Sequence, residues 1–263
     1  MRIARFSHFG EVSYGIVTRD DGDELAVAQL AAHPFGGRKE DIELTGKGFA
    51  LADVRLLAPV LPSKVICVGQ NYADHVREMG RQAPAEPVIF LKPSTSVCGP
   101  DDPIQRPARL SQRVDYEGEL AVVIGRLCRD VPRDLAGAVI FGYTCANDVT
   151  ARDLQARDGQ WSRAKGFDAF CPLGPWIATD ADPSDLALTT TLNGEVKQES
   201  RTSHMLRDVP ALIEFVSAVM TLLPGDVLLT GTPAGVGPMQ AGDEVSVTIE
   251  GVGTLANPVA DRA

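Results

Sequence analysis

Three acidic residues near the middle of the chain have the types and spacing of a metal site. Glu117 and Glu119 are separated by one glycine at the head of the apolar run 120–124, and Asp148 follows among small and apolar residues. Side chains two apart on a strand share a face, so both glutamates can reach one ion while alternate apolar residues bury the other face. Oxygen ligands suit Mg²⁺, Mn²⁺ or Ca²⁺, and the pattern therefore predicts a site for a hard divalent cation.

Such a cation could polarise a carbonyl group. Three carboxylates leave coordination positions open for water and for a substrate that chelates through two oxygens, such as a 2-oxo acid. The simpler interpretation is that Glu117 and Glu119 solvate the outer face of a half-exposed strand. Ala121 and Val123 continue that face without further charge, which favours the metal site.

His75 and Glu78 form a candidate general base. They lie three residues apart in the segment 71–78, which is expected to be helical and to end at Gly80, so they share a helix face. A carboxylate that orients an imidazole raises its basicity, and the pair could activate a water molecule. An ordinary surface ion pair is the alternative. The polar loop 81–87 follows, so helix and loop could form a lid that orders over the substrate.

Lys165 is expected to be buried, because its neighbours in the segment 164–172 are small or aromatic. A buried ammonium group needs a partner, which a substrate carboxylate or a developing enolate oxygen could provide. Pairing of the lysine with Asp168 is the alternative.

The glycine-rich segment 230–238 is a candidate anion-binding loop. It lacks the Gly-Lys-Ser/Thr ending of a P-loop, so it is not a nucleotide site. Its backbone N–H groups and the Thr232 hydroxyl could bind a carboxylate, although a tight turn between two strands explains the glycines equally well.

The elements that must position these residues are mainly strands. Short runs of Val, Ile and Leu separated by Gly and Pro predict strands over residues 65–68, 88–91, 120–124, 139–143, 188–192, 227–229 and 245–249. Asn193 and Gly194 have the signature of a tight hairpin. An amphipathic pattern between Asp208 and Pro224 predicts one helix over residues 209–223 that covers a sheet.

Composition restricts the class of protein and its partners. The 263 residues are 44% hydrophobic and 23% charged, as in soluble globular proteins, and we expect a small N-terminal domain over residues 1–60 and a larger domain over residues 61–263. A net charge of -10 without a basic block argues against nucleic acid and anionic membranes, and an anionic substrate then needs local positive charge. The five cysteines are scattered, which predicts reduced thiols, and no apolar stretch is long enough to span a bilayer. We therefore expect a cytoplasmic protein.

Six segments, in order over residues 60–260, resemble the fumarylacetoacetate hydrolase family. They are residues 69–75 (GQNYADH), 90–93 (FLKP), 115–120 (DYEGEL), 147–153 (NDVTARD), 164–168 (AKGFD) and 230–237 (TGTPAGVG). The resemblance implies a mixed β-roll catalytic domain, a homodimer, and Mg²⁺ or Mn²⁺ held by Glu117, Glu119 and Asp148.

The resemblance also implies roles for the other candidates. His75 and Glu78 would be the water-activating pair on the lid. Lys165 and Gln155 would face the substrate or its oxyanion, and Thr232 would bind the substrate carboxylate. Tyr72 and Lys92 are weaker candidates for contacts near the same pocket. Gln70 stands where the animal enzymes have a further acidic ligand, and their longer C-terminal part is missing. The chain is thus closer to the short bacterial members, whose substrates include acylpyruvates, oxaloacetate and 2-hydroxymuconate-type diacids.

Our hypothesis from the sequence is cleavage of a C–C bond in a 2-oxo acid, by acylpyruvate hydrolysis or oxaloacetate decarboxylation, through an enolate that the metal stabilises. The presence of both His75 and Glu78 favours cleavage. The alternatives are an isomerase or decarboxylase of 2-hydroxymuconate-type diacids in aromatic catabolism, and a non-catalytic module that binds a metal and a 2-oxo acid. A cupin-like metal barrel is rejected, because the four histidines are not spaced as paired ligands.

Overall fold

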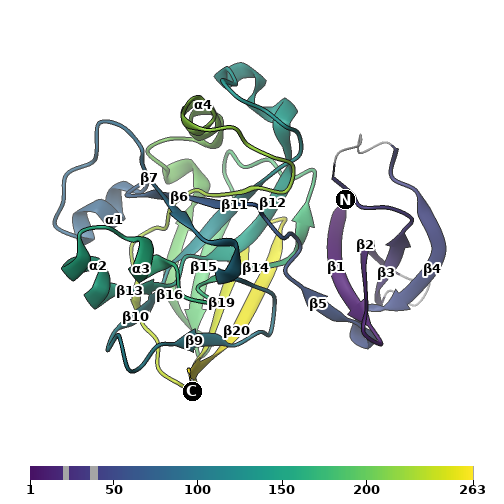
Figure 1. The fold of residues 1–263 in the computed structure, drawn as a ribbon, viewed down its shortest axis with the longest axis horizontal. Coiled ribbons are helices and arrows are strands. Elements are labelled where there is room, and N and C mark those ends of the chain that lie inside the picture. Colours follow the sequence, from purple (N-terminus) through teal and green to yellow (C-terminus); the bar gives the residue numbers. More distant parts are fainter. Residues whose placement is uncertain (20–23, 36–40, 263) are drawn as a thin grey trace.

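The computed structural model describes residues 1–19, 24–35 and 41–262. Strands dominate it and the helices are few and short, which confirms the predicted mainly β fold (Figure 1). All the strands predicted from the sequence are present; the one predicted over residues 139–143 begins at Ile140 and continues to Asn147. Among the described residues, no helix has the length and apolar character needed to cross a membrane.

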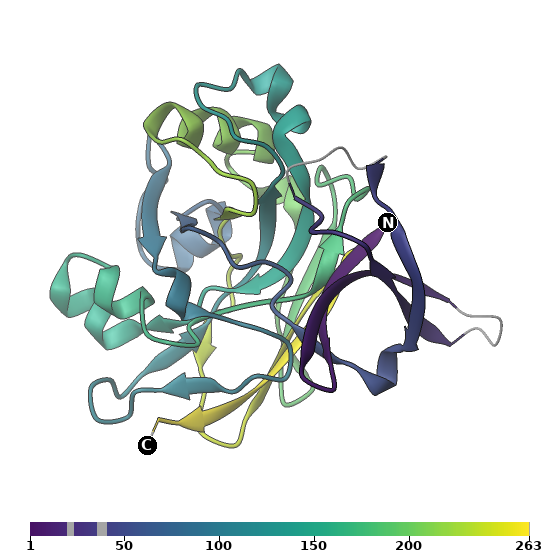
Figure 2. The same cartoon turned by 45° about the vertical axis from the view of Figure 1, so that its right-hand side comes forward.

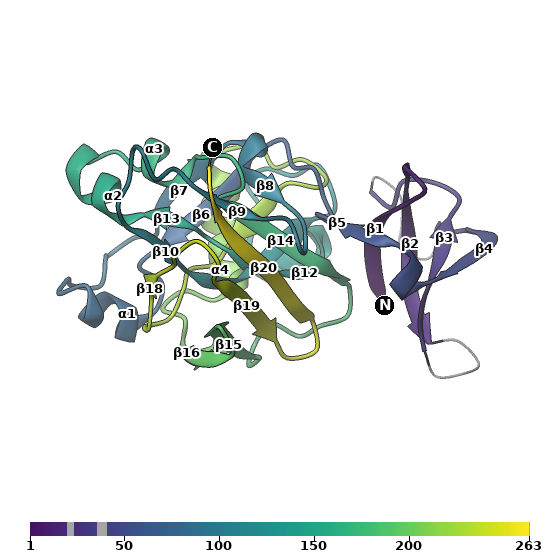
Figure 3. The same cartoon turned by 90° about the horizontal axis from the view of Figure 1, so that it is seen from below.

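The N-terminal part of the chain forms a strongly curved antiparallel sheet beside the main body (Figures 2 and 3). Its strands are β1 (Arg2–His8), β2 (Glu11–Arg19), β3 (Leu25–Leu30), β4 (Leu44–Ala50) and the short β5 (Arg55–Leu57). The 3-10 turn η2 (Leu51–Asp53) lies between β4 and β5. Strand β1 also pairs with β14 (Cys171–Ala178) through Arg2 and Ile3. The N-terminal strands and the main sheet are therefore hydrogen-bonded into one continuous sheet.

The main sheet has β11 near its middle. From β1 outward its order is β14, β12 (Ile140–Asn147), β11 (Gly118–Ile124), β17 (Val227–Leu229), β6 (Val65–Gly69) and β7 (Val88–Lys92), with the short β8 (Val97–Cys98) pairing with β14. Strands β17 and β6 run parallel, and the other neighbours along this path are antiparallel.

Both faces of β11 are buried. Leu120, Val122 and Ile124 pack into one apolar cluster, as the alternating pattern predicted. Ala121 and Val123 pack into a second cluster on the opposite face. The face that carries Glu119 therefore belongs to the interior and is not a solvated surface.

Two smaller sheets complete the body. One has the order β16 (Glu195–Arg201), β15 (Ala187–Leu192), β19 (Glu244–Ile249), β20 (Gly253–Asp261) and β9 (Ile104–Arg106); the other has the order β13 (Thr150–Ala151), β10 (Val114–Tyr116) and β18 (Gly237–Pro238). The predicted hairpin joins β15 to β16 through Asn193 and Gly194, whose φ angles of 52° and 80° are those of a tight turn that suits these two residue types.

The helices are α1 (Ala73–Glu78), α2 (Arg152–Asp158), α3 (Ser162–Lys165) and α4 (Val209–Val219), with 3-10 turns η3 (Ser94–Ser96), η4 (Arg133–Val139) and η5 (Thr202–His204). Helices α1, α2 and α3 lie on the side of the main body away from the N-terminal strands (Figures 1 and 3). The predicted helix 209–223 is four residues too long. Met220 is extended, and Leu222 instead exchanges two backbone hydrogen bonds with Cys128, so a tertiary contact ends the helix.

Candidate active site

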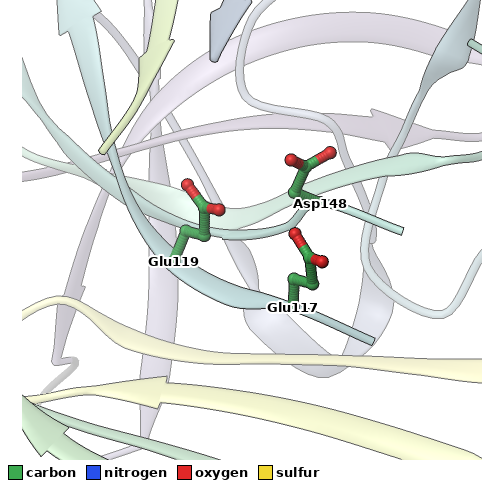
Figure 4. Close-up of side chains that lie close together, drawn as sticks. All are labelled: Glu117, Glu119 and Asp148. Carbon is green, nitrogen blue, oxygen red and sulfur yellow. The ribbon is translucent and has the colours of Figure 1, made fainter. Parts of the chain in front are cut away.

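The three acidic residues predicted to share an ion lie together at the ends of two neighbouring strands (Figure 4). Glu117 directly precedes β11, Glu119 is its second residue, and Asp148 directly follows β12. Pairing of Gly118 with Asn147 brings these strand ends side by side. All three side chains are buried, and one oxygen of each lies within 4.8 Å of the others.

Close packing fixes the backbone between the two glutamates. A Cβ atom at Gly118 would lie 2.0 Å from Thr190 Oγ1, so only glycine fits between the strand and the neighbouring sheet. The Gly118 N–H donates to Gln198 Oε1 at 2.9 Å, and the Glu117 N–H donates to Asn147 Oδ1 at the same distance. The glycine of the Glu-Gly-Glu sequence is thus required by the fold.

Two buried lysines lie against these carboxylates. Lys165 Nζ donates to Glu117 Oε2 at 2.8 Å and to Asp148 Oδ2 at 2.7 Å, and Lys92 Nζ donates to the other Asp148 oxygen and to the Val149 carbonyl. Lys165 is buried, as predicted, with only 2% of its surface exposed. Asp168, the alternative partner, instead pairs with Arg262.

The neighbouring charges determine which groups of the cluster are ionised. Burial disfavours the ionised form of Glu117, but Lys165 and Arg152 outweigh it and hold the pKa of this carboxyl well below its usual range. Burial likewise disfavours the Lys165 ammonium, yet Asp148 and Glu117 keep its pKa above the ordinary lysine value. Both groups are therefore charged at neutral pH.

Glu119 behaves in the opposite way. Burial, and then the carboxylates of Asp148 and Glu117, raise its pKa well above the usual value, against the opposing effects of Lys165 and the Gly231 N–H. Among the described residues, Glu119 is the acid of the cluster that is bonded to neither a lysine nor an arginine. A buried donor set made only of carboxylate oxygens fits Mg²⁺ or Mn²⁺, so Glu117, Glu119 and Asp148 are suited to hold either ion.

His75 and Glu78 are in contact on α1. His75 is buried, and its Nδ1 lies 3.0 Å from Glu78 Oε2. The other Glu78 oxygen accepts a hydrogen bond from the Gly235 N–H at 2.9 Å. A hydrogen bond from Nδ1–H to Glu78 leaves Nε2 as the basic nitrogen of the ring.

The glycine-rich loop between β17 and β18 binds carboxylates of the protein itself. Its Gly231 N–H donates to Glu119 at 2.6 Å, and its Gly235 N–H donates to Glu78. The Thr232 hydroxyl donates to the Gly118 carbonyl and accepts from Gln198 Nε2, each at 2.8 Å. The loop therefore connects the acidic cluster to the His75–Glu78 pair.

A narrow cavity of about 30 Å³ joins these groups. Of the predicted residues, its wall contains Glu117, Glu119, Asp148, His75, Lys165, Gln155 and Thr232. In the part of the chain that the structure describes, Tyr72 and Lys92 are fully buried and lie outside this wall. Glu78 is also outside the wall but is hydrogen-bonded to His75, which belongs to it. In the loop 81–87, which is predicted to be part of a lid, the Ala85 carbonyl accepts a hydrogen bond from Arg207 at 3.0 Å.

Several residues of the wall have no role that was predicted from the sequence. Arg152 donates to Asp115 at 2.9 Å, to Glu117, and to Gln155 at 2.7 Å, so it positions an acidic ligand and a neighbouring amide. Its place four residues after Asp148 in the segment 147–153 was the available signal. Met79, Arg81, Phe90 and Trp161 also line the cavity. Gln70 lines it with a φ angle of 60°, a backbone conformation that is uncommon for this residue type.

Comparison with known proteins decides the family. Residues 64–260 match the family model described as fumarylacetoacetate (FAA) hydrolase C-terminal. The chain belongs to the fumarylacetoacetate hydrolase family. Residues 1–59 match a second model, described as Rv2993c-like, N-terminal.

Relatives in this family cover nearly the whole chain. Protein Rv2993c of Mycobacterium tuberculosis is 57% identical over 98% of both chains. The oxaloacetate tautomerase YisK of Bacillus subtilis is 40% identical over 91% of this chain and 84% of its own. A crystal structure of 5-carboxymethyl-2-hydroxymuconate delta-isomerase from Mycobacterium smegmatis is 56% identical, covers 100% of both chains and superposes with a TM-score of 0.92. The chain is therefore similar to enzymes of the fumarylacetoacetate hydrolase family over its full length.

Proposed function

We propose that the protein transfers a proton at C3 of a small 2-oxo diacid, as an enol–keto tautomerase or isomerase that requires Mg²⁺ or Mn²⁺. The observation that carries this proposal is the position of His75, which is held by Glu78 on the wall of the cavity that also contains the three acidic side chains. Similarity to an oxaloacetate tautomerase and to a muconate isomerase supports it, because enol–keto tautomerisation moves a proton between carbon and oxygen.

The residues of the cavity divide the reaction between them. A divalent ion held by Glu117, Glu119 and Asp148 would supply Lewis acidity toward the keto and carboxylate oxygens of the substrate. His75 Nε2 removes a proton from C3, the C–H electron pair forms the C2–C3 double bond, and the negative charge develops on the C2 oxygen. His75 then returns the proton to that oxygen to complete the enol, and the reverse sequence yields the keto form.

Lys165 and Glu78 support this proton transfer. Lys165 uses two of its three N–H groups on Glu117 and Asp148, which leaves one for the developing enolate oxygen. Glu78 stabilises the imidazolium that forms when His75 takes the proton, and the Gly235 N–H keeps Glu78 in place. A four- or five-carbon diacid is larger than the cavity, so its binding requires the cavity to widen.

C–C cleavage, the reaction favoured from the sequence, is the second candidate. A cavity of about 30 Å³ has room for a water molecule next to His75. The same His75–Glu78 pair could deprotonate that water for attack on the distal carbonyl of an acylpyruvate. Loss of carbon dioxide from oxaloacetate would form a pyruvate enolate without water attack.

Deuterium exchange at C3 distinguishes these reactions. The protein with Mg²⁺ or Mn²⁺ would be mixed in D₂O with oxaloacetate, acetylpyruvate or a 2-hydroxymuconate-type diacid, and followed by NMR against a protein-free sample. Exchange or double-bond migration without pyruvate supports the tautomerase or isomerase, whereas pyruvate formation supports cleavage. His75→Gln should abolish either activity. The matched control is His204→Gln, at an exposed histidine on η5 outside the cavity wall. A protein that binds these acids but transforms none of them would be a binding module.

A further inference from the structure

Three cationic side chains line the cavity, and two of them are already neutralised. Lys165 is bound to Glu117 and Asp148, and Arg152 is bound to Asp115 and Glu117. Arg81 has no acidic partner among the described residues, although it lines the same cavity. In a protein with a net charge of -10 and a cavity rich in carboxylates, this guanidinium group is available to an anionic ligand.

Arg81 and the acidic cluster differ in exposure within the same cavity wall. Glu117, Glu119 and Asp148 are buried and form the floor, whereas Arg81 is exposed and therefore lies at the mouth. A 2-oxo acid whose carboxylate and keto oxygens lie on the floor must extend the rest of its chain toward this mouth. A second carboxylate at the end of that chain would meet Arg81.

The backbone of Arg81 is held in a defined position by the end of α1. Its N–H donates to the Val76 carbonyl and the Gly80 N–H donates to the Arg77 carbonyl, both at 3.0 Å, with Gly80 at a φ angle of 64°. These are the two hydrogen bonds of a Schellman motif, in which glycine occupies the left-handed position. Arg81 is thus attached directly to the helix that carries His75 and Glu78.

We propose that Arg81 binds the distal carboxylate of the substrate and makes the site selective for dicarboxylic 2-oxo acids. This inference rests on the proposed function, because it takes the floor of the cavity as the place where the 2-oxo acid end binds. A guanidinium group pairs with a carboxylate through two parallel hydrogen bonds, and an uncharged end group of the same size gains nothing from it. Arg81 is a specificity residue, since it contacts neither C3 nor the keto oxygen.

Binding of two matched ligands tests this inference without turnover. 2-Oxoglutarate and 2-oxopentanoate have the same five-carbon chain, and a methyl group replaces the distal carboxylate in the second. Their dissociation constants for the Mg²⁺-loaded protein would be measured by calorimetry and by the fluorescence of Trp161, which lines the cavity. The other tryptophan, Trp176, lies outside the cavity wall and donates a hydrogen bond to the Val252 carbonyl.

The variants are Arg81→Gln, Arg81→Lys and the control Arg77→Gln. Arg77 is exposed on the same helix, and its Nε donates to the Ala73 carbonyl outside the cavity wall, so the control removes the same charge from the same region. We expect the wild type and Arg77→Gln to prefer 2-oxoglutarate. Arg81→Gln should weaken 2-oxoglutarate binding about tenfold, as expected for loss of a charge-assisted hydrogen bond, and 2-oxopentanoate binding less than twofold. Arg81→Lys should retain part of the preference.

The outcomes separate this inference from the proposed function. Equal weakening of both ligands by Arg81→Gln, or an unchanged preference, would overturn the role of Arg81 and leave the proposed function standing. Failure of the wild type to bind either ligand would overturn both. An unchanged melting temperature of Arg81→Gln, expected because the guanidinium group has no acidic partner among the described residues, shows that the fold is intact.

Discussion

Gly235 donates its backbone N–H to Glu78 at 2.9 Å, across 157 residues of sequence. This hydrogen bond attaches the base-orienting carboxylate of α1 to the loop that also donates to Glu119 through Gly231. The acidic cluster and the His75–Glu78 pair are therefore held by the same loop. Because the loop uses a different N–H group for each, a substitution in one group can leave the contact of the other unchanged.

Replacing Glu78 by Gln should slow proton transfer without affecting the metal site. The amide keeps the shape of the side chain but removes the negative charge that supports the His75 imidazolium. We expect kcat to fall by about 10²-fold, within the range for general base catalysis. Steady-state kinetics and a Mn²⁺ titration check this, and a variant with wild-type kcat would show that His75 works without its partner.

Replacing Lys165 by Met should destabilise the metal-free protein and increase its response to metal. Removal of the ammonium leaves Glu117 paired with Arg152 alone and Asp148 paired with Lys92 alone, and breaking a buried pair costs about 3 kcal/mol. A divalent cation should restore much of this loss, so Mg²⁺ should raise Tm more in the variant than in the wild type. Lys197→Met, which removes a partly exposed ion pair with Glu195, is the control and should change stability by less than about 1 kcal/mol. Equal Tm shifts in variant and wild type would contradict this assignment of charge.

Replacing Glu119 by Gln should be tolerated without metal and should abolish the stabilisation by metal. Because burial and two neighbouring carboxylates raise the pKa of Glu119, the folded protein binds a proton that the unfolded chain releases at a lower pH. The free energy of unfolding of the metal-free wild type should then fall as pH rises above the ordinary glutamate pKa, toward the raised pKa of the folded state. Gln mimics the protonated acid, so this fall should be absent from the variant. Thermal unfolding between pH 5 and 8, with EDTA and with Mn²⁺, measures both effects. The raised pKa would be contradicted if the stability of the wild type rose over this pH interval and the stability of the variant did not.

Replacing Gly118 by Ala should destabilise the fold at the site. The added Cβ would lie 2.0 Å from Thr190 Oγ1 and 3.2 Å from Gln198 Oε1, and such overpacking typically costs about 1–3 kcal/mol. Gly137→Ala is the matched control, because a Cβ atom there meets nothing within 4 Å. Urea unfolding gives both values. Adding Thr190→Ala to Gly118→Ala should recover part of the loss, and strictly additive effects would show that the two residues do not compete for space.

The sequence by itself determined those features that depend on neighbouring residues. The alternation in residues 120–124 predicted that Leu120, Val122 and Ile124 bury one face of β11, and Asn193 with Gly194 predicted the hairpin between β15 and β16. The separation of Glu117 and Glu119 by one residue predicted that they share a strand face. Six ordered segments were sufficient to recognise the family.

Only the tertiary structure decided how these features meet. The end of α4 depends on the pairing of Leu222 with Cys128, which helix periodicity cannot show. The bonds of Lys165 to Glu117 and of Gly231 to Glu119 span 48 and 112 residues, so no local pattern selects these partners. Buried charges and N–H groups must find partners wherever the fold brings opposite charges and acceptors within reach. That requirement acts through space and not along the chain. It does not apply to Arg81, whose side chain is exposed at the cavity and has no acidic partner among the described residues.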